Sequence, residues 1–197
     1  MRWIVFDYGE VISKRTRALP ELAEVLGAEE IAFENAYWAH RHDYDGGMTD
    51  LAYWRAVGAL VGADVDESTS ARLTKIDTTG WLTADRSTVE LLEELRATGV
   101  RLALLSNAPA SFARAAEGQP WTRLFDHLLF SGDLGAVKPD AEIWAILLDR
   151  LGAAAADCVF YDDRQVNIDG AAAAGLTAEL WTNAAGARAH LAALDVL

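Results

Sequence analysis

Polar residues able to perform acid, base or nucleophilic chemistry directly follow three apolar stretches of the chain. They are Asp7 after residues 3–6, Ser106 and Asn107 after residues 102–105, and Asp162 and Asp163 after residues 159–161. In open parallel sheets, ligands bind just beyond the carboxyl ends of the strands. If these stretches are neighbouring parallel strands, the polar residues meet at one edge of the sheet.

Three carboxylates gathered at one sheet edge repel one another, and a divalent cation relieves that repulsion. Carboxylate and carbonyl oxygens are ligands that suit magnesium, which takes further ligands from water and substrate phosphate. Lys138, in the loop 135–140, would add a second positive charge, and Ser106 would add a hydroxyl donor. Both groups are suited to holding phosphoryl oxygens. The residues therefore indicate magnesium-dependent chemistry on a phosphate ester.

The elements that must position these residues are predicted by the hydrophobic pattern. From residue 83 onward, amphipathic helical segments alternate with short apolar runs, an alternation that predicts a parallel α/β sheet. Between Asp7 and Leu82 the pattern is helical, with glycine breaks at 46–47 and near 62. The predicted strands are residues 3–6, 100–105, 128–130, 158–161 and 178–181, and helices are predicted near 87–98, 141–151, 168–174 and 188–194.

Length and charge restrict the function further. A chain of 197 residues can bury one core and a small second lobe. Its net charge of −13 argues against nucleic acid as a partner, because phosphate backbones are bound by clustered cations. No apolar run approaches the roughly 20 residues needed to span a membrane. With one cysteine, Cys158, no internal disulfide is possible, so we expect a cytoplasmic protein. No pattern indicates an oligomeric state.

The chain resembles the haloacid dehalogenase superfamily through four short motifs in the family's order. They are Phe6-Asp7-Tyr8-Gly9, Leu105-Ser106-Asn107, Lys138-Pro139-Asp140 and Tyr161-Asp162-Asp163. Each motif is weak alone, but their order and their places on the predicted elements reinforce one another. The resemblance implies a Rossmann-like α/β core, with a parallel sheet flanked by helices, over residues 1–14 and 83–197. It also implies a small helical cap over residues 15–82.

The resemblance also implies a role for each matched residue. Asp7 would attack phosphorus and form an aspartyl-phosphate that water then hydrolyses. Ser106 and Lys138 would hold the transferring group. Asp7, the backbone carbonyl of Gly9 and Asp163 would bind magnesium, with Asp162 closer to the water shell of the ion. The expected substrate is a small phosphorylated metabolite.

One position departs from the family pattern. Family phosphatases usually carry a second aspartate two residues after the nucleophile, where it protonates the leaving oxygen, but this chain has Gly9 there and Glu10 next. Loss of a positioned general acid typically lowers the rate about 10²- to 10⁴-fold. Two hypotheses follow. The substrate has a leaving group that needs little protonation, such as an anomeric sugar phosphate or an acyl phosphate, or Glu10 substitutes imperfectly.

The segment 38–46 combines aromatic, cationic and acidic residues within the predicted cap. Either Arg41, with Trp38 or Tyr44, faces the site and selects the substrate, or the segment is a solvated helix end with Trp38 in the cap core. We favour the second interpretation for every residue except Arg41, which we expect to contact substrate. His40 and His42 point in different directions on a helix, which argues against a zinc site. Five other tryptophans fall on predicted apolar faces and are expected to be packing residues: Trp54, Trp81, Trp121, Trp144 and Trp181.

The sequence allows more than one role for each of two asparagine side chains. Asn107 either orients substrate or caps the next turn. Asn167 is expected to cap or brace its helix.

Two other functions are compatible with an aspartate nucleophile or with this fold. A carbon-halogen hydrolase does not need to protonate its leaving halide, but family members with that activity dispense with the metal and have a less acidic fourth motif than Asp162-Asp163. The second alternative is a protein that lost its general acid and only binds phosphorylated metabolites. Retention of all four matched residues argues against decay into a binding protein: Asp7, Ser106, Lys138 and Asp163.

Overall fold

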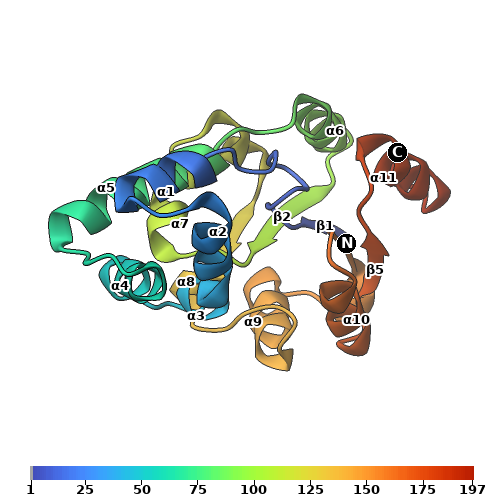
Figure 1. Ribbon diagram of the computed structural model, residues 1–197. Coiled ribbons are helices and arrows are strands. Elements are labelled where there is room, and N and C mark those ends of the chain that lie inside the picture. The colour runs from blue at the N-terminus through green and yellow to red at the C-terminus, as the bar shows by residue number, and fades with distance from the viewer. Residues whose placement is uncertain (1) are drawn as a thin grey trace.

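The structure is a computed structural model that describes residues 2–197. Within this range the chain forms a sheet of five parallel strands in the order β3-β2-β1-β4-β5. Helices cover both faces of the sheet, and a group of helices lies to one side (Figure 1). The fold is the predicted α/β class with a Rossmann-like parallel sheet. The strands are β1 Trp3–Phe6, β2 Arg101–Ser106, β3 His127–Phe130, β4 Cys158–Asp162 and β5 Thr177–Leu180.

The central strands are apolar on both sides because both faces of the sheet are covered. Alternate residues point to opposite faces, so Ile4 and Phe6 pack in one core while Trp3 and Val5 pack in the other. The first core lies under α6, α7 and α11, and the second under α9 and α10. These helices and the short elements between them are α6 Arg86–Ala97, α7 Ala110–Glu117, η1 Pro120–Leu124, α8 Ser131–Leu134, α9 Ala141–Leu151, η2 Ala155–Asp157, α10 Gln165–Ala173 and α11 Ala184–Ala193.

Five helices follow the first strand and share a separate hydrophobic cluster. They are α1 Leu19–Leu26, α2 Glu30–Ala39, α3 Arg41–Asp45, α4 Asp50–Val61 and α5 Glu67–Trp81. Their buried side chains include Leu22, Tyr37, Trp54 and Leu73. Thr49 and Asp66 cap the amino ends of α4 and α5 by accepting hydrogen bonds from backbone N–H groups. This group lies on the left in Figure 1, beside the carboxyl ends of the strands.

Local signals account for most helix boundaries. Helix α9 coincides with the predicted helix because Gly152, at φ 58°, adopts the left-handed conformation that ends it. Asp85 caps the start of α6 by accepting hydrogen bonds from the backbone N–H groups of Ser87 and Thr88. Helix α11 begins at Ala184, earlier than the predicted residue 188, because the side chain of Asn183 caps it through the N–H of Gly186.

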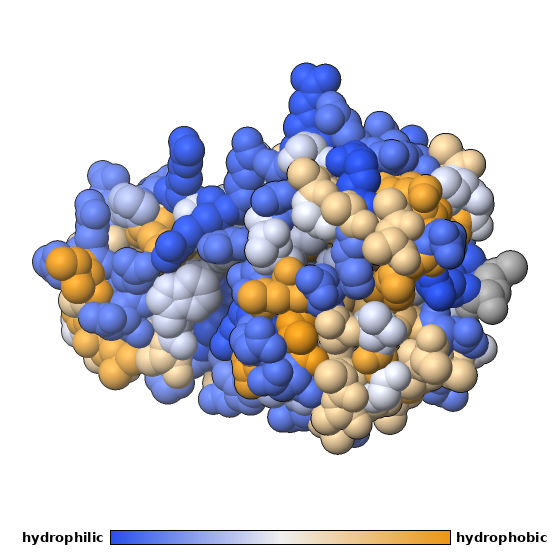
Figure 2. All heavy atoms as spheres, turned by 90° about the vertical axis from the view of Figure 1, so that its right-hand side faces the viewer, coloured by the Kyte–Doolittle hydropathy of each residue, from blue (hydrophilic) through white to orange (hydrophobic). Residues whose placement is uncertain are grey.

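The face that carries β5, α10 and α11 mixes apolar and polar side chains (Figure 2). Strand β5 is the edge strand beyond β4, and its Leu180 is exposed, as is Val166 on α10. Among residues 2–197, no helix is both long enough and apolar enough to cross a membrane.

Candidate active site

The strand order places the predicted polar residues around Asp7. Strand β1 lies between β2 and β4, so Asp7 is flanked by Ser106 at the end of β2 and by Asp162 at the end of β4. A pocket of about 180 Å³ opens at this point, and it is lined by every predicted site residue except Asp162, which is completely buried. A cavity of this size holds a phosphoryl group and a few waters, at about 30 Å³ for each water.

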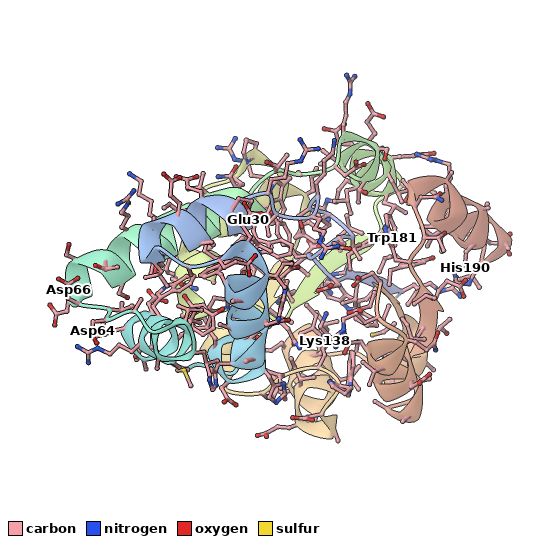
Figure 3. All side chains as sticks on the ribbon, in the orientation of Figure 1. Glu30, Asp64, Asp66, Lys138, Trp181 and His190 are labelled. Carbon is pink, nitrogen blue, oxygen red and sulfur yellow. The ribbon has the colours of Figure 1, made fainter. Side chains whose placement is uncertain are left out.

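Lys138 reaches the floor of this pocket from the loop before α9. Its Nζ donates to Asp7 Oδ1 at 2.7 Å and to Asp162 Oδ2 at 2.6 Å. Figure 3 shows Lys138 between the sheet and α9. Burial lowers the pKa of Lys138, but the charges of Asp7 and Asp162 outweigh burial and leave that pKa above its ordinary value. Lys138 therefore remains a fixed positive charge next to Asp7.

Asn107 holds the lysine loop in place. Its side-chain amide donates to the carbonyl of Lys138 and accepts from the N–H of Lys138, both at 2.8 Å. The two hydrogen bonds occupy both ends of the amide. Asn107 also lines the pocket, but the contacts in the structure are those of a clamp on Lys138, a third role besides the two predicted for it.

Asp162 is the best-bonded carboxylate of the site. In addition to Lys138, it accepts from Asn167 Nδ2 at 2.9 and 3.0 Å and from the N–H of Arg164 at 2.8 Å. Asn167 was expected to cap or brace its helix, and its amide instead braces this carboxylate. Among the described residues, Asn167 Oδ1 is buried without a hydrogen-bond partner and belongs to a residue that lines the pocket. It is an acceptor available to a bound water.

Asp7, Asp162 and Asp163 can place one carboxylate oxygen each within 4.8 Å of one another. Burial raises the pKa of Asp7 to about 7, opposed by Lys138 and reinforced by Asp162. Burial, followed by the charge of Asp162, also raises the pKa of Asp163 to about 6. The positive charge that the protein itself supplies does not balance these three carboxylates. An all-oxygen donor set with one unpartnered amide oxygen nearby fits magnesium with its water shell.

Arg41 lies in the pocket wall, but its guanidinium is already engaged within the helical group. Its Nε donates to Asp45 at 2.9 Å, and one terminal nitrogen donates to the Tyr37 hydroxyl at 2.5 Å and to Asp77 at 3.3 Å. Two buried carboxylates therefore neutralise Arg41. The contacts in the structure hold α3 against α2 and α5.

Asp45 provides a prediction about stability. Burial raises the pKa of Asp45 to about 6, with Asp77 adding to the shift and Arg41 and His42 opposing it. A folded pKa above the unfolded value of about 3.9 stabilises the fold fully below about pH 4, and this contribution is lost as pH rises through 6. We therefore compare the free energy of unfolding of the wild type with that of Asp45→Asn. Relative to this variant, the wild type is expected to lose about 3 kcal/mol of stability between pH 4 and 7. Urea denaturation across this range measures it, and a constant difference would contradict it.

Trp38 does not pack in the cap core, and that prediction is wrong. Its side chain is 42% exposed and lines the pocket, while Tyr37 is fully buried in the core of the helical group. Neighbouring helical residues point about 100° apart, so the direction that buries Tyr37 in α2 turns Trp38 toward the edge of the buried stripe. The spacing of Phe33 and Tyr37, four residues apart, was the signal that assigns the stripe to Tyr37.

The other tryptophans divide in a similar way. The predicted packing role is confirmed for the buried members Trp54, Trp121, Trp144 and Trp181. Trp81 is only partly buried and also lines the pocket, a position that the hydrophobic pattern did not indicate.

Gly9 and Glu10 occupy the place of the missing acid. A Cβ atom added at Gly9 would lie 4.0 Å from Asp7 Oδ2 and meet no other heavy atom at that range, so the position has space for a side chain. Glu10 adopts a φ of 55°, and its side chain is 46% exposed and 3.7 Å from Arg15. Both residues line the pocket.

Comparisons with known proteins identify the family to which the chain is similar. A family model described as haloacid dehalogenase-like hydrolase matches residues 1–175. A sesquiterpene phosphatase of Aspergillus oryzae is 35% identical over 100 residues, which cover 50% of this chain and 51% of that protein, so the match spans about half of each. A phosphatase of Mycobacterium tuberculosis is 25% identical over 90% of this chain and 85% of its own length.

Solved structures show the same fold. A haloacid dehalogenase family enzyme from Bacteroides thetaiotaomicron, in complex with magnesium and inorganic phosphate, has a TM-score of 0.73 at 17% identity and covers 92% of this chain and 94% of its own. The L-2-haloacid dehalogenase of Xanthobacter autotrophicus, with chloropropionic acid covalently bound, has a TM-score of 0.74 at 17% identity and covers 90% and 76%. With a family model that matches most of its length, this chain belongs to the haloacid dehalogenase-like hydrolases.

Proposed function

We propose that the chain is a magnesium-dependent hydrolase of phosphate monoesters, with a core of residues 1–14 and 83–197 and a cap of residues 15–82. One observation carries the proposal. Asp7 lies at the floor of a pocket, 2.7 Å from a buried lysine, and two further carboxylates can place their oxygens within 4.8 Å of its own. That arrangement combines a nucleophile, a fixed cation and ligands for a second cation. Two relatives that carry the name phosphatase support it.

In the proposed reaction, Asp7 attacks phosphorus and the bond from phosphorus to the alcohol oxygen breaks. The alcohol leaves with the bonding electron pair and takes up a proton, and an aspartyl-phosphate remains on Asp7. Water then attacks this phosphorus, which releases inorganic phosphate and restores the carboxylate. Lys138 and Ser106 donate to the phosphoryl oxygens in both steps.

Magnesium, held by Asp7, Asp163 and the Gly9 carbonyl, would supply positive charge that offsets the charge of the phosphoryl oxygens. Asp162 has a different role from the one expected of it in the water shell. Because its oxygens already accept from Lys138, Asn167 and the N–H of Arg164, we propose that Asp162 orients the lysine.

The missing general acid leads to a gain-of-function prediction. Since Gly9 has space for a side chain that faces Asp7, Gly9→Asp is expected to supply an acid to the leaving oxygen. It should raise kcat/KM for alkyl phosphates by about 10²-fold and leave it nearly unchanged for nitrophenyl phosphate, whose leaving group needs no proton. Gly9→Asn is the control of matched size. An equal effect of both substitutions, or none with alkyl esters, would contradict this account of Gly9.

The function is tested by phosphate release from an activated aryl phosphate, with magnesium and after its removal by a chelator. The expected result is turnover that requires the metal. Metal-independent release of halide from a 2-haloacid would support the dehalogenase alternative, and absence of turnover with both substrate classes would support a binding protein. The likeness to the Xanthobacter dehalogenase, at 17% identity, extends to the fold alone.

A further inference from the structure

The pocket is lined by an aromatic wall as well as by its charged floor. We use this term for Tyr8, Trp38, Trp81 and Phe112, which all line the pocket. Trp38 comes from α2 and Trp81 ends α5, both in the helical group on the left of Figure 1, whereas Tyr8 and Phe112 belong to the α/β core. Trp38 is one of the large hydrophobic residues that remain exposed, at 42%. An indole placed at a pocket with this much free surface is available to contact a ligand.

Contacts behind the wall hold its rings in place. The Trp38 ring packs edge-on against the buried Tyr37, with centroids 4.8 Å apart. Trp81 Nε1 donates to the Tyr37 hydroxyl at 3.1 Å, and the Tyr8 hydroxyl donates to the carbonyl of Trp81 at 2.7 Å. The rings are therefore oriented before any ligand arrives, which reduces the entropy lost on binding.

Three residues on this side of the pocket already use polar groups in contacts within the protein. The Tyr8 hydroxyl, the Trp81 indole N–H and the Arg41 guanidinium all donate to protein acceptors. A sugar or other polyol would need partners for its hydroxyl groups, because buried hydroxyls without hydrogen bonds are costly. The wall instead offers ring surfaces, which bind flat apolar groups.

The catalytic side of the pocket adds a second requirement. With glycine at position 9, no carboxyl group stands two residues after Asp7 to protonate the leaving oxygen. A phenol, with a pKa near 10 like that of tyrosine, leaves as its anion far more readily than an alkyl alcohol does. The ring surfaces and the absent acid thus favour the same kind of leaving group.

We infer that the substrates are aryl phosphates, monoesters of a phenol whose ring stacks against Trp38 and Trp81. This inference rests on the proposed phosphatase function and specifies its substrate class. The phosphoryl group lies at Asp7 and Lys138, and the aromatic ring extends toward the cap. Breakage of the phosphorus–oxygen bond releases a phenolate, which takes a proton from water.

Phosphonates resist hydrolysis, so their binding tests the preference for an aromatic ring separately from the phosphatase activity. Phenylphosphonate, cyclohexylphosphonate and methylphosphonate are titrated into the magnesium-loaded protein by calorimetry. Phenylphosphonate is expected to bind most tightly, and Trp38→Ala is expected to weaken it roughly tenfold while methylphosphonate is unaffected. Ile31→Ala is the matched control, because Ile31 lies on the same helix, is 70% exposed and does not line the pocket.

The outcomes are distinguishable. If methylphosphonate binds and phenylphosphonate is no tighter, or if cyclohexylphosphonate equals phenylphosphonate, the aryl assignment is wrong and the phosphatase proposal stands. If none of the three binds, both proposals fail. If Trp38→Phe retains most of the phenyl preference that Trp38→Ala loses, the preference comes from an aromatic ring at this position.

Discussion

Asp7→Asn is expected to lower kcat for phosphate ester hydrolysis by about 10⁴-fold or more, the range seen when a covalent nucleophile is removed. The amide has the size of the carboxylate but is a far weaker nucleophile for phosphorus. The fold should survive, because Lys138 keeps its 2.6 Å hydrogen bond to Asp162. The substitution also removes a carboxylate whose pKa burial raises to about 7, so it removes an unfavourable buried charge.

The measurement is phosphate release at saturating substrate and magnesium, together with a thermal melt. Asp64→Asn is a suitable control, since Asp64 is exposed in the loop before α5 and lies far from Lys138 in Figure 3. The control should retain wild-type activity. An Asp7→Asn protein that keeps more than a few per cent of the wild-type rate would remove Asp7 from the mechanism.

Lys138→Met is expected to reduce stability as well as activity. The Lys138 side chain is 1% exposed and its ammonium lies between Asp7 and Asp162, so its removal leaves two carboxylates buried without a counter-charge. Breaking a buried ion pair by removal of one partner typically costs 3–5 kcal/mol, about 6–20 °C in Tm for a chain of this size. Chemical denaturation at neutral pH without magnesium measures the free energy of unfolding.

A double substitution shows whether the stability lost in Lys138→Met comes from uncompensated charge or from lost packing. Asp162→Asn in the Lys138→Met background removes one of the two stranded charges and should restore part of the lost stability without restoring activity. Asp162→Asn alone should destabilise the wild type, since it removes a partner of Lys138. If the double variant is as unstable as the sum of the two single variants, the electrostatic explanation is incorrect.

The positions of Asp7, Ser106 and Asp162 could be predicted from the sequence because each one ends or directly follows an apolar run, whereas Lys138 was found through the family motif. An apolar run that ends in Asp7 or in Asp162 is a local pattern, and parallel strands place their carboxyl ends at the same edge of the sheet. The pairing of β1 with β4, which brings these two residues side by side, is a property of the fold. The helical group could be predicted for the same reason, since amphipathic spacing is also local.

The directions of individual side chains could not be predicted in this way. Trp38 and Tyr37 are adjacent aromatic residues. The four-residue spacing from Phe33 favours burial of Tyr37, but the packing of α2 against α1 and α4 decides that Trp38 stays exposed at the pocket. The clamp of Asn107 on Lys138 joins residues that are 31 positions apart, and it depends on how two loops meet. Contacts of this kind arise from tertiary packing and leave no periodic trace in the sequence.

The central claim is that Asp7 carries the phosphoryl group during turnover. The most direct test is to stop the reaction with acid during steady-state hydrolysis and to locate the phosphoryl group by peptide mass spectrometry. We expect the added mass of one phosphoryl group on the peptide that contains Asp7, present only when both substrate and magnesium are supplied. A phosphoryl group on a different residue would contradict it.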